Sequence, residues 1–128
     1  MIPNVDDEVR QAIQARWESE LDRLNRTPVD QALRRVFAAA AEDDSLRGLF
    51  PFTSMNRLCF SRCSDYPFTI DCPCIQATPT SYFVLATWTV GDHPAAVLLE
   101  TADVKEAVAA VVANLPADRA VWIGSSGE

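Results

Sequence analysis

The sequence predicts an α+β fold, with two amino-terminal helices packed against a mostly antiparallel sheet of four or five strands and one long helix near the carboxyl terminus. Apolar residues recur every three or four positions before residue 44 and alternate in segments after residue 57. The 128 residues are 48% hydrophobic and 23% charged, which is typical of globular proteins. We therefore expect one domain over residues 1–128, with a helical hairpin over residues 1–44 and the sheet and its helix over residues 57–124.

Two amphipathic segments predict the helical hairpin. From Asp7 to about Arg26 the apolar residues fall on one stripe of a helix, which comprises Val9, Ile13, Trp17, Leu21 and Leu24. Thr27 is a residue type favoured as an N-cap. Pro28 suits the first position of a helix, because proline lacks the N–H group that would be unpaired there. The second helix should then run from Pro28 to about Asp43, and the short break favours packing of the two helices as neighbours.

After residue 44 the spacing of apolar residues changes from that of helices to that of strands. Residues 44–52 are interpreted as a turn or a single helical turn, whereas residues 58–62 alternate between two faces. β-Branched and aromatic residues dominate residues 81–90, which predicts a strand with Tyr82 and Trp88 on one face.

The rest of the sequence predicts a hairpin, a helix and a last strand. Residues 91–94 have the composition of a turn, so residues 95–100 should return beside the preceding strand. Residues 103–106 have the spacing of a capping box, and the valine-rich helix that they begin should end at Pro116. Residues 120–123 are interpreted as a short strand before a frayed tail. A strand, a helix and a strand in one sheet would form a right-handed crossover.

The charge of the chain argues against two classes of partner. Eleven Lys and Arg against eighteen Asp and Glu give a formal charge of −7, which repels nucleic acid and anionic lipid surfaces. The amino terminus does not resemble a secretory signal, and the longest apolar stretches, residues 36–41 and 107–113, are shorter than a membrane span. We therefore expect a cytoplasmic protein with reduced thiols that binds neither nucleic acid nor membranes.

Four cysteines lie within sixteen residues, at Cys59, Cys63, Cys72 and Cys74. Thiolates at such short spacings can bind zinc. However, an extended chain would hold Cys59 and Cys63 about 13 Å apart, and Pro73 favours an extended chain between Cys72 and Cys74. A zinc site would require the first pair to lie on a turn, so we expect no metal and no cofactor.

The cysteine pairing depends on where the chain reverses. If residues 64–67 form a four-residue hairpin loop, Cys63 lies opposite Phe68 and Cys59 lies opposite Cys72, at a separation that a disulfide accepts. We therefore predict that Cys59 and Cys72 are close in space. The alternative interpretation is that the cysteines are reduced apolar residues of the core.

Polar groups concentrate around this cysteine segment and suggest a small-molecule pocket with arginine as an anion clamp. The candidate binding residues are Arg62, Cys63, Tyr66, Asp71 and Cys72, with Arg57 and Asp65 nearby. In the alternative interpretation Arg62 pairs with Asp71 across the hairpin. The chain has only one histidine, His93, in a predicted turn, so no partner for a nucleophilic thiol is evident and no catalytic residue is assigned.

Several short motifs together resemble a family of small actinobacterial proteins of unassigned activity that are found near natural-product biosynthetic genes. The segments that carry the resemblance, within about residues 45–124, are Leu49–Ser54, Leu58–Cys63, Tyr66–Phe68, Asp71–Pro73 and Asn114–Pro116. Members of that family often end in an acidic segment, whereas this sequence ends in Gly-Ser-Ser-Gly-Glu. The resemblance implies a biosynthetic setting and no mechanism.

These observations favour an accessory or small-molecule-binding protein of natural-product biosynthesis. Its partners would be a pathway intermediate or a biosynthetic enzyme, and it could form a homodimer. One alternative is a small biosynthetic enzyme whose site contains Arg62 with Cys63 or Cys72. Another is an acidic inhibitor or immunity-type protein, which the net charge of −7 would suit.

Overall fold

The structure, a computed structural model, describes residues 5–28, 31–88 and 95–127 and contains one five-stranded antiparallel sheet. The strands lie in the sheet in their sequence order: β1 (Phe50–Ser54), β2 (Arg57–Ser61), β3 (Cys74–Ala77), β4 (Tyr82–Leu85) and β5 (Val97–Thr101). Each strand pairs with the next, which confirms the α+β class and the predicted hairpin of β4 and β5.

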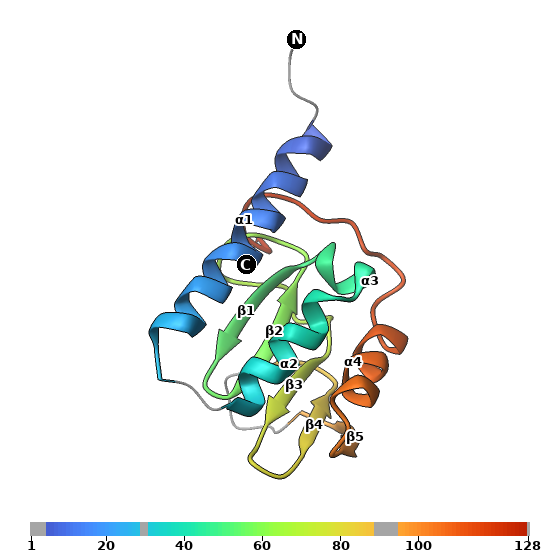
Figure 1. Cartoon of the computed structure of the whole chain (residues 1–128). Coiled ribbons are helices and arrows are strands. Elements are labelled where there is room, and N and C mark those ends of the chain that lie inside the picture. Colours follow the sequence, from blue (N-terminus) through green and yellow to red (C-terminus); the bar gives the residue numbers. More distant parts are fainter. Residues whose placement is uncertain (1–4, 29–30, 89–94, 128) are drawn as a thin grey trace.

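The described residues form four helices: α1 (Val5–Arg26), α2 (Gln31–Ala41), α3 (Asp44–Arg47) and α4 (Val104–Ala113). Figure 1 shows α1, α2 and α4 on one face of the sheet, where α1 packs on β1, α2 on β2 and β3, and α4 on β3 to β5. The long helix of the protein is α1, with 22 residues, and the expectation of a long carboxy-terminal helix is wrong because α4 has 10. Asp103 caps α4 as predicted, since its side chain accepts a hydrogen bond from the Lys105 N–H.

Two apolar clusters lie on opposite faces of the sheet. The larger one fills the space between the sheet and the helices, and β2 contributes Leu58 and Phe60 to it. The smaller one lies on the face that carries none of the described helices, which we call the helix-free face, and comprises Phe52, Cys59, Cys74, Leu85 and Trp88. The alternation predicted for residues 58–62 is thus confirmed, because Cys59 faces away from Leu58 and Phe60.

Strand β1 and the position of Trp88 differ from the sequence-based expectations. Residues 50–54 form an edge strand instead of continuing the turn, and Pro51 is tolerated there because an edge strand pairs on one side only. Trp88 was expected beside Tyr82, but β4 ends at Leu85 after a register shift. The chain after this irregularity no longer follows the alternation of the strand, and Trp88 joins the smaller cluster.

The predicted pairing of Cys59 with Cys72 is wrong. Strand β2 pairs with β3 in a register that places Leu58 opposite Ile75, so Cys59 neighbours Cys74 and not Cys72. The chain does turn between Arg62 and Thr69, since the Thr69 N–H donates to the Ser61 hydroxyl at 3.2 Å and the Arg62 N–H donates to the Thr69 hydroxyl at 3.0 Å. Residues 70–73 then separate this contact from β3. The β2–β3 connection therefore spans residues 62–73.

Residues 120–126 do not form a strand of the sheet, so the predicted crossover is absent from its described strands. This segment instead runs parallel to the beginning of the 62–73 loop, with a bridge between Cys63 and Trp122 where Cys63 was expected to face Phe68. The Trp122 N–H donates to the Arg62 carbonyl at 2.9 Å, and the Ser126 N–H donates to the Pro67 carbonyl at 2.9 Å. The tail is thus held by hydrogen bonds as far as Ser126.

Two further expectations concern other parts of the chain. The predicted turn at residues 91–94, with His93, lies outside the described residues. Within the parts of the chain that are described, none of the helices combines the length and apolar character needed to span a membrane.

Candidate functional site

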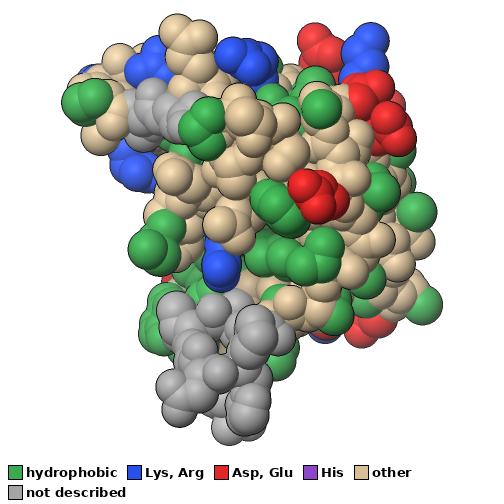
Figure 2. All heavy atoms as spheres, turned by 90° about the horizontal axis from the view of Figure 1, so that it is seen from below, with side chains coloured by type: hydrophobic (Ala, Val, Ile, Leu, Met, Phe, Trp, Pro, Cys, Tyr) green, Lys and Arg blue, Asp and Glu red, His purple; other side chains and the backbone are tan. Residues whose placement is uncertain are grey.

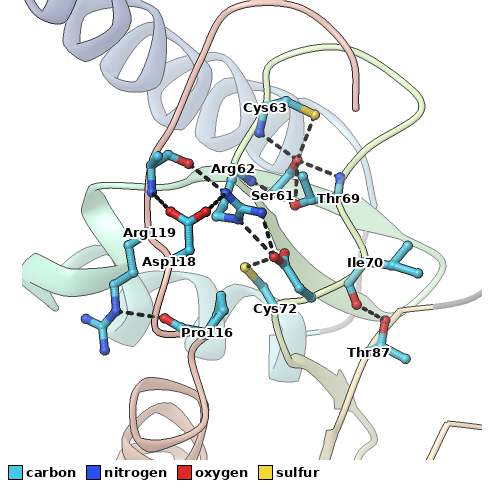
Figure 3. Close-up of polar contacts among 12 residues, drawn as sticks. Ser61, Arg62, Cys63, Thr69, Ile70, Cys72, Thr87, Pro116, Asp118 and Arg119 are labelled. Atoms are coloured by element: carbon cyan, nitrogen blue, oxygen red, sulfur yellow. Dashed lines mark hydrogen bonds and ion pairs between the residues drawn. The ribbon is translucent and has the colours of Figure 1, made fainter. Parts of the chain in front are cut away.

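Arg62 is the centre of a polar network that joins the 62–73 loop to residues 118–126, which we call the carboxy-terminal segment (Figure 3). Its Nε and Nη2 atoms lie 2.9 and 2.8 Å from Asp71 Oδ2, and its Nη1 atom donates to the Ala120 carbonyl at 3.1 Å. Asp118 lies 3.5 Å from Nη1, and the guanidinium stacks 5.3 Å from the centre of the Trp122 ring. The hydrogen bond with Asp71 raises the pKa of Arg62. The pairing of Arg62 with Asp71 is therefore present, and the guanidinium is occupied by groups of this chain.

The thiols of Cys63 and Cys72 are buried and face oxygen atoms of their own loop. Cys63 Sγ lies 3.5 Å from the Asp65 carbonyl oxygen and 3.6 Å from that of Pro67. Cys72 Sγ lies 3.8 Å from Asp71 Oδ1 (Figure 3). Burial, followed by the negative charge of Asp71, raises the pKa of Cys72 to about 12. The reactive thiolate form of Cys72 is thus disfavoured at neutral pH.

We expect this thiol to make the protein less stable at high pH. In the unfolded chain Cys72 loses its proton near its ordinary pKa of 9.0, whereas the folded protein keeps that proton up to about pH 12. Deprotonation therefore favours unfolding, and between these values Cys72 should lower the free energy of unfolding by up to about 1.4 kcal/mol per pH unit. Urea unfolding at a series of pH values should show a steeper decline in the wild type than in Cys72→Ala. Equal slopes would contradict the assignment.

The four cysteines do not converge on one point. Cys59 and Cys74 belong to the smaller cluster, and Cys72 belongs to the larger cluster on the other face of the sheet. Within residues 5–28, 31–88 and 95–127, no three His, Cys, Asp or Glu side chains gather in a way that could hold a metal ion.

The helix-free face carries a hollow of about 240 Å³, which we call the aromatic groove; it is lined by Phe52, Thr53, Ser54, Tyr66, Phe68 and Trp88. The rings of Phe52 and Phe68 stack with 4.2 Å between their centres, and Trp88 meets Phe52 edge-on at 5.1 Å. A hydrogen bond fixes the position of the Trp88 ring, because its Nε1–H donates to the Thr69 carbonyl at 3.0 Å. Tyr66 stands at the rim, 68% exposed, with its ring edge-on to Phe68. A fixed aromatic floor and an exposed aromatic wall thus form one concave surface.

Two other hollows lie among the helices. One, of about 260 Å³, lies between α2 and α4 and is lined in part by Glu42, Asp43 and Lys105. The other, of about 290 Å³, lies where α1 and α3 meet the carboxy-terminal segment, and Arg10 and Arg47 line it. Neither hollow contains a residue of the predicted binding set.

The structure divides the predicted binding residues between two places. Tyr66 lines the aromatic groove, whereas Arg62, Asp71 and Cys72 lie together around the ion pair and Cys63 is buried beneath the loop. Sequence reasoning missed the other five lining residues, which include the aromatic Phe52, Phe68 and Trp88. The available signal was an excess of aromatic residues around the cysteines, but those residues belong to separate segments whose meeting depends on the tertiary fold.

The face drawn in Figure 2 does not favour the protein-inhibitor alternative. Its acidic side chains lie mostly at one edge and share the surface with basic and hydrophobic ones. This face does not present the continuous acidic surface that would mask a basic partner.

Comparison with known proteins identifies the family to which this chain belongs. A search of the curated proteins and of the solved structures finds no match to this chain. The profile of a family of unknown function, DUF6193, matches residues 11–122, which include every strand of the sheet and the 62–73 loop. With most of its length matched, the chain belongs to the DUF6193 family.

Proposed function

We propose that this protein is an accessory, small-molecule-binding protein of natural-product biosynthesis in an actinobacterial cytoplasm, and that the aromatic groove is its ligand site. The biosynthetic setting rests on the motif resemblance within residues 45–124. The binding role rests on one observation, the concave aromatic surface on the helix-free face of the sheet. The ligand would be a pathway intermediate, presented to or received from a biosynthetic enzyme.

The lining of the groove indicates the chemical class of the ligand. Ligand sites are mostly apolar and contain a few polar groups that fix orientation. Here Phe52, Phe68 and Trp88 provide the apolar surface, and the hydroxyl groups of Thr53, Ser54 and Tyr66 lie around it. A volume of about 240 Å³ suits one planar ring system. Because the described residues of the lining include no charged side chain, the group that enters should be uncharged and flat.

The burial of the thiols favours binding over the small-enzyme alternative. Cys63 and Cys72 are both 0% exposed, and the pKa of Cys72 is raised to about 12. A thiol nucleophile needs an accessible thiolate. Arg62, the third residue of that alternative, is held by Asp71 and Ala120.

We expect the groove to bind small aromatic probes such as indole and 1-naphthol. The Trp88 Nε1–H resonance, assigned through Trp88→Phe, should shift during an NMR titration because Trp88 forms the floor of the groove. Tyr66→Ala should weaken binding about 3- to 10-fold, which is the value of one lost aromatic contact. Tyr66 is exposed, so this variant should fold like the wild type.

Ile70→Ala is the matched control, because Ile70 is a 63% exposed apolar residue of the same loop that does not line the groove. Equal affinities in Tyr66→Ala and the wild type, or equal losses in Tyr66→Ala and Ile70→Ala, would contradict the assignment. Native mass spectrometry of the protein isolated from its own cells would then test the physiological role. We expect the mass of a bound small molecule in the wild-type protein and its absence in Phe68→Ala.

A further inference from the structure

Cys59 on β2 and Cys74 on β3 occupy a position of the sheet where two side chains come unusually close. The pairing of Arg57 with Gln76 and of Leu58 with Ile75 makes Cys74 the next residue across from Cys59. The Ala77 N–H donates to the Asn56 carbonyl at 2.8 Å, which marks Asn56 and Ala77 as a hydrogen-bonded pair. Hydrogen-bonded and non-hydrogen-bonded pairs alternate along an antiparallel ladder. Cys59 and Cys74 therefore form a non-hydrogen-bonded pair.

This type of pair suits a disulfide. Its Cα atoms lie about 4.5 Å apart and its side chains are closer than in the other type of pair, within the range that disulfides accept. Both sulfurs lie on the helix-free face, within the smaller cluster, and both residues are 0% exposed. The Cys74 thiol donates to the Thr87 carbonyl, with 3.7 Å between sulfur and oxygen. The interaction with the Cys74 sulfur, together with burial, raises the pKa of Cys59, and the interaction with the Cys59 sulfur lowers that of Cys74. The positive charge of Arg57 also lowers the pKa of Cys74.

We propose that Cys59 and Cys74 are a redox-active dithiol that hydrogen peroxide converts into a disulfide between β2 and β3. In the first step the Cys74 thiolate attacks one peroxide oxygen and breaks the O–O bond, giving a sulfenic acid and hydroxide. In the second step the Cys59 sulfur attacks the sulfenic sulfur, and the Cys59 proton leaves with the hydroxyl group as water. The hydroxide and the proton that Cys74 had released form the second water. Two thiols are oxidised and one peroxide is reduced to two waters.

The other two cysteines are internal controls. Cys63 contacts carbonyl oxygens of its own loop, and Cys72 lies on the opposite face of the sheet from Cys59 and Cys74. Neither has a sulfur partner in the part of the chain that the structure describes. A disulfide from Cys72 to Cys59 or Cys74 would have to cross the sheet.

The site also adjoins the aromatic groove. Cys59 lies opposite Phe52 on its other side, so the dithiol is next to one of the two stacked rings. Because both sulfurs are buried, peroxide reaches them during local opening of this face, and oxidation should be slower than that of free cysteine. The proposal does not depend on whether the groove binds a ligand.

The test is oxidation of the folded full-length protein with hydrogen peroxide, followed by alkylation of the remaining thiols under denaturing conditions and peptide mapping without reductant. We expect a mass loss of two hydrogen atoms, one linked peptide pair containing Cys59 and Cys74, and alkylation of Cys63 and Cys72. Dithiothreitol should reverse the change. No linkage in the folded protein, or a linkage that involves Cys63 or Cys72, would overturn the proposal.

Single variants add a second test. Cys63→Ala and Cys72→Ala should keep the loss of two hydrogen atoms, whereas Cys59→Ala and Cys74→Ala should abolish the internal disulfide. The peptide map of the wild type tests for the Cys59–Cys74 disulfide by itself. The outcome of the test therefore does not depend on whether each variant folds. An intermolecular disulfide in place of the internal one would also count against it.

Discussion

Replacing Trp17 with alanine is expected to lower the free energy of unfolding by about 3–5 kcal/mol, as for other large aromatic residues in cores. Trp17 is 2% exposed and packs against Phe37 and Phe60, with 5.3 and 6.3 Å between ring centres. Its Nε1–H also donates to the Leu49 carbonyl at 3.0 Å, and the Arg47 guanidinium stacks on its ring. One side chain thus joins α1, α2 and β2 with the turn before β1. A domain stabilised by roughly 5–15 kcal/mol would lose much of its stability.

Urea unfolding followed by circular dichroism measures this loss, and two variants divide it into its parts. Trp17→Phe keeps most of the packing but leaves the Leu49 carbonyl without its donor, which should cost about 1–3 kcal/mol. Leu21→Ala is the control: the helical stripe predicted a buried residue, but Leu21 is 49% exposed, so its loss should be within about 0.5 kcal/mol. A similar cost for Trp17→Ala and Leu21→Ala would show that Trp17 does not hold the elements together.

The second large effect is expected from Arg62→Ala, which should cost about 2–3 kcal/mol. The change removes both hydrogen bonds to Asp71, the bond to the Ala120 carbonyl and the stacking on Trp122. The Arg62 side chain is only 14% exposed, while that of Asp71 is 37% exposed, so water compensates Asp71 in part. The carboxy-terminal segment should separate from the 62–73 loop before the sheet unfolds.

Two measurements distinguish this local separation from global loss of stability. Hydrogen exchange at the Trp122 and Ser64 amides, which bond across the two segments, should accelerate in Arg62→Ala under native conditions. The control is Arg26→Ala, because Arg26 pairs with Asp22 at 3.1 Å on the open surface of α1, and such pairs contribute about 0.2–1 kcal/mol. Unchanged exchange in Arg62→Ala would contradict the role of Arg62 as the link.

The parts of the fold that the sequence predicts correctly depend on short-range patterns. The helix cap at Asp103 and the alternation of Leu58, Cys59 and Phe60 involve neighbours in the chain, and the structure confirms both. Strand β1 was missed because Pro51 argues against a strand unless one knows that the strand lies at an edge. Its position in the sheet is a property of the tertiary fold.

The cysteine pairing and the groove could not be predicted because they depend on the width of one loop. Pairing Cys59 with Cys72 assumed that the two strands pair directly from a loop at residues 64–67, but residues 70–73 lie between the Ser61–Thr69 contact and β3, and the partner of Cys59 is Cys74. The same wide loop brings Phe68 onto Phe52 and Trp88. Local sequence patterns do not contain the length at which a loop closes.

The parallel contact between residues 62–67 and residues 122–126 has a consequence for protein synthesis. A ribosome synthesises the sheet strands and the 62–73 loop before it makes Asp118, Ala120 and Trp122. Until then Arg62 has only Asp71 as a partner, and the backbone groups of Ser64 and Asp65 that later bond to the tail are open to water. The contact between the two segments can therefore form only after residues 118–126 have been synthesised, later than the helices and strands that precede them.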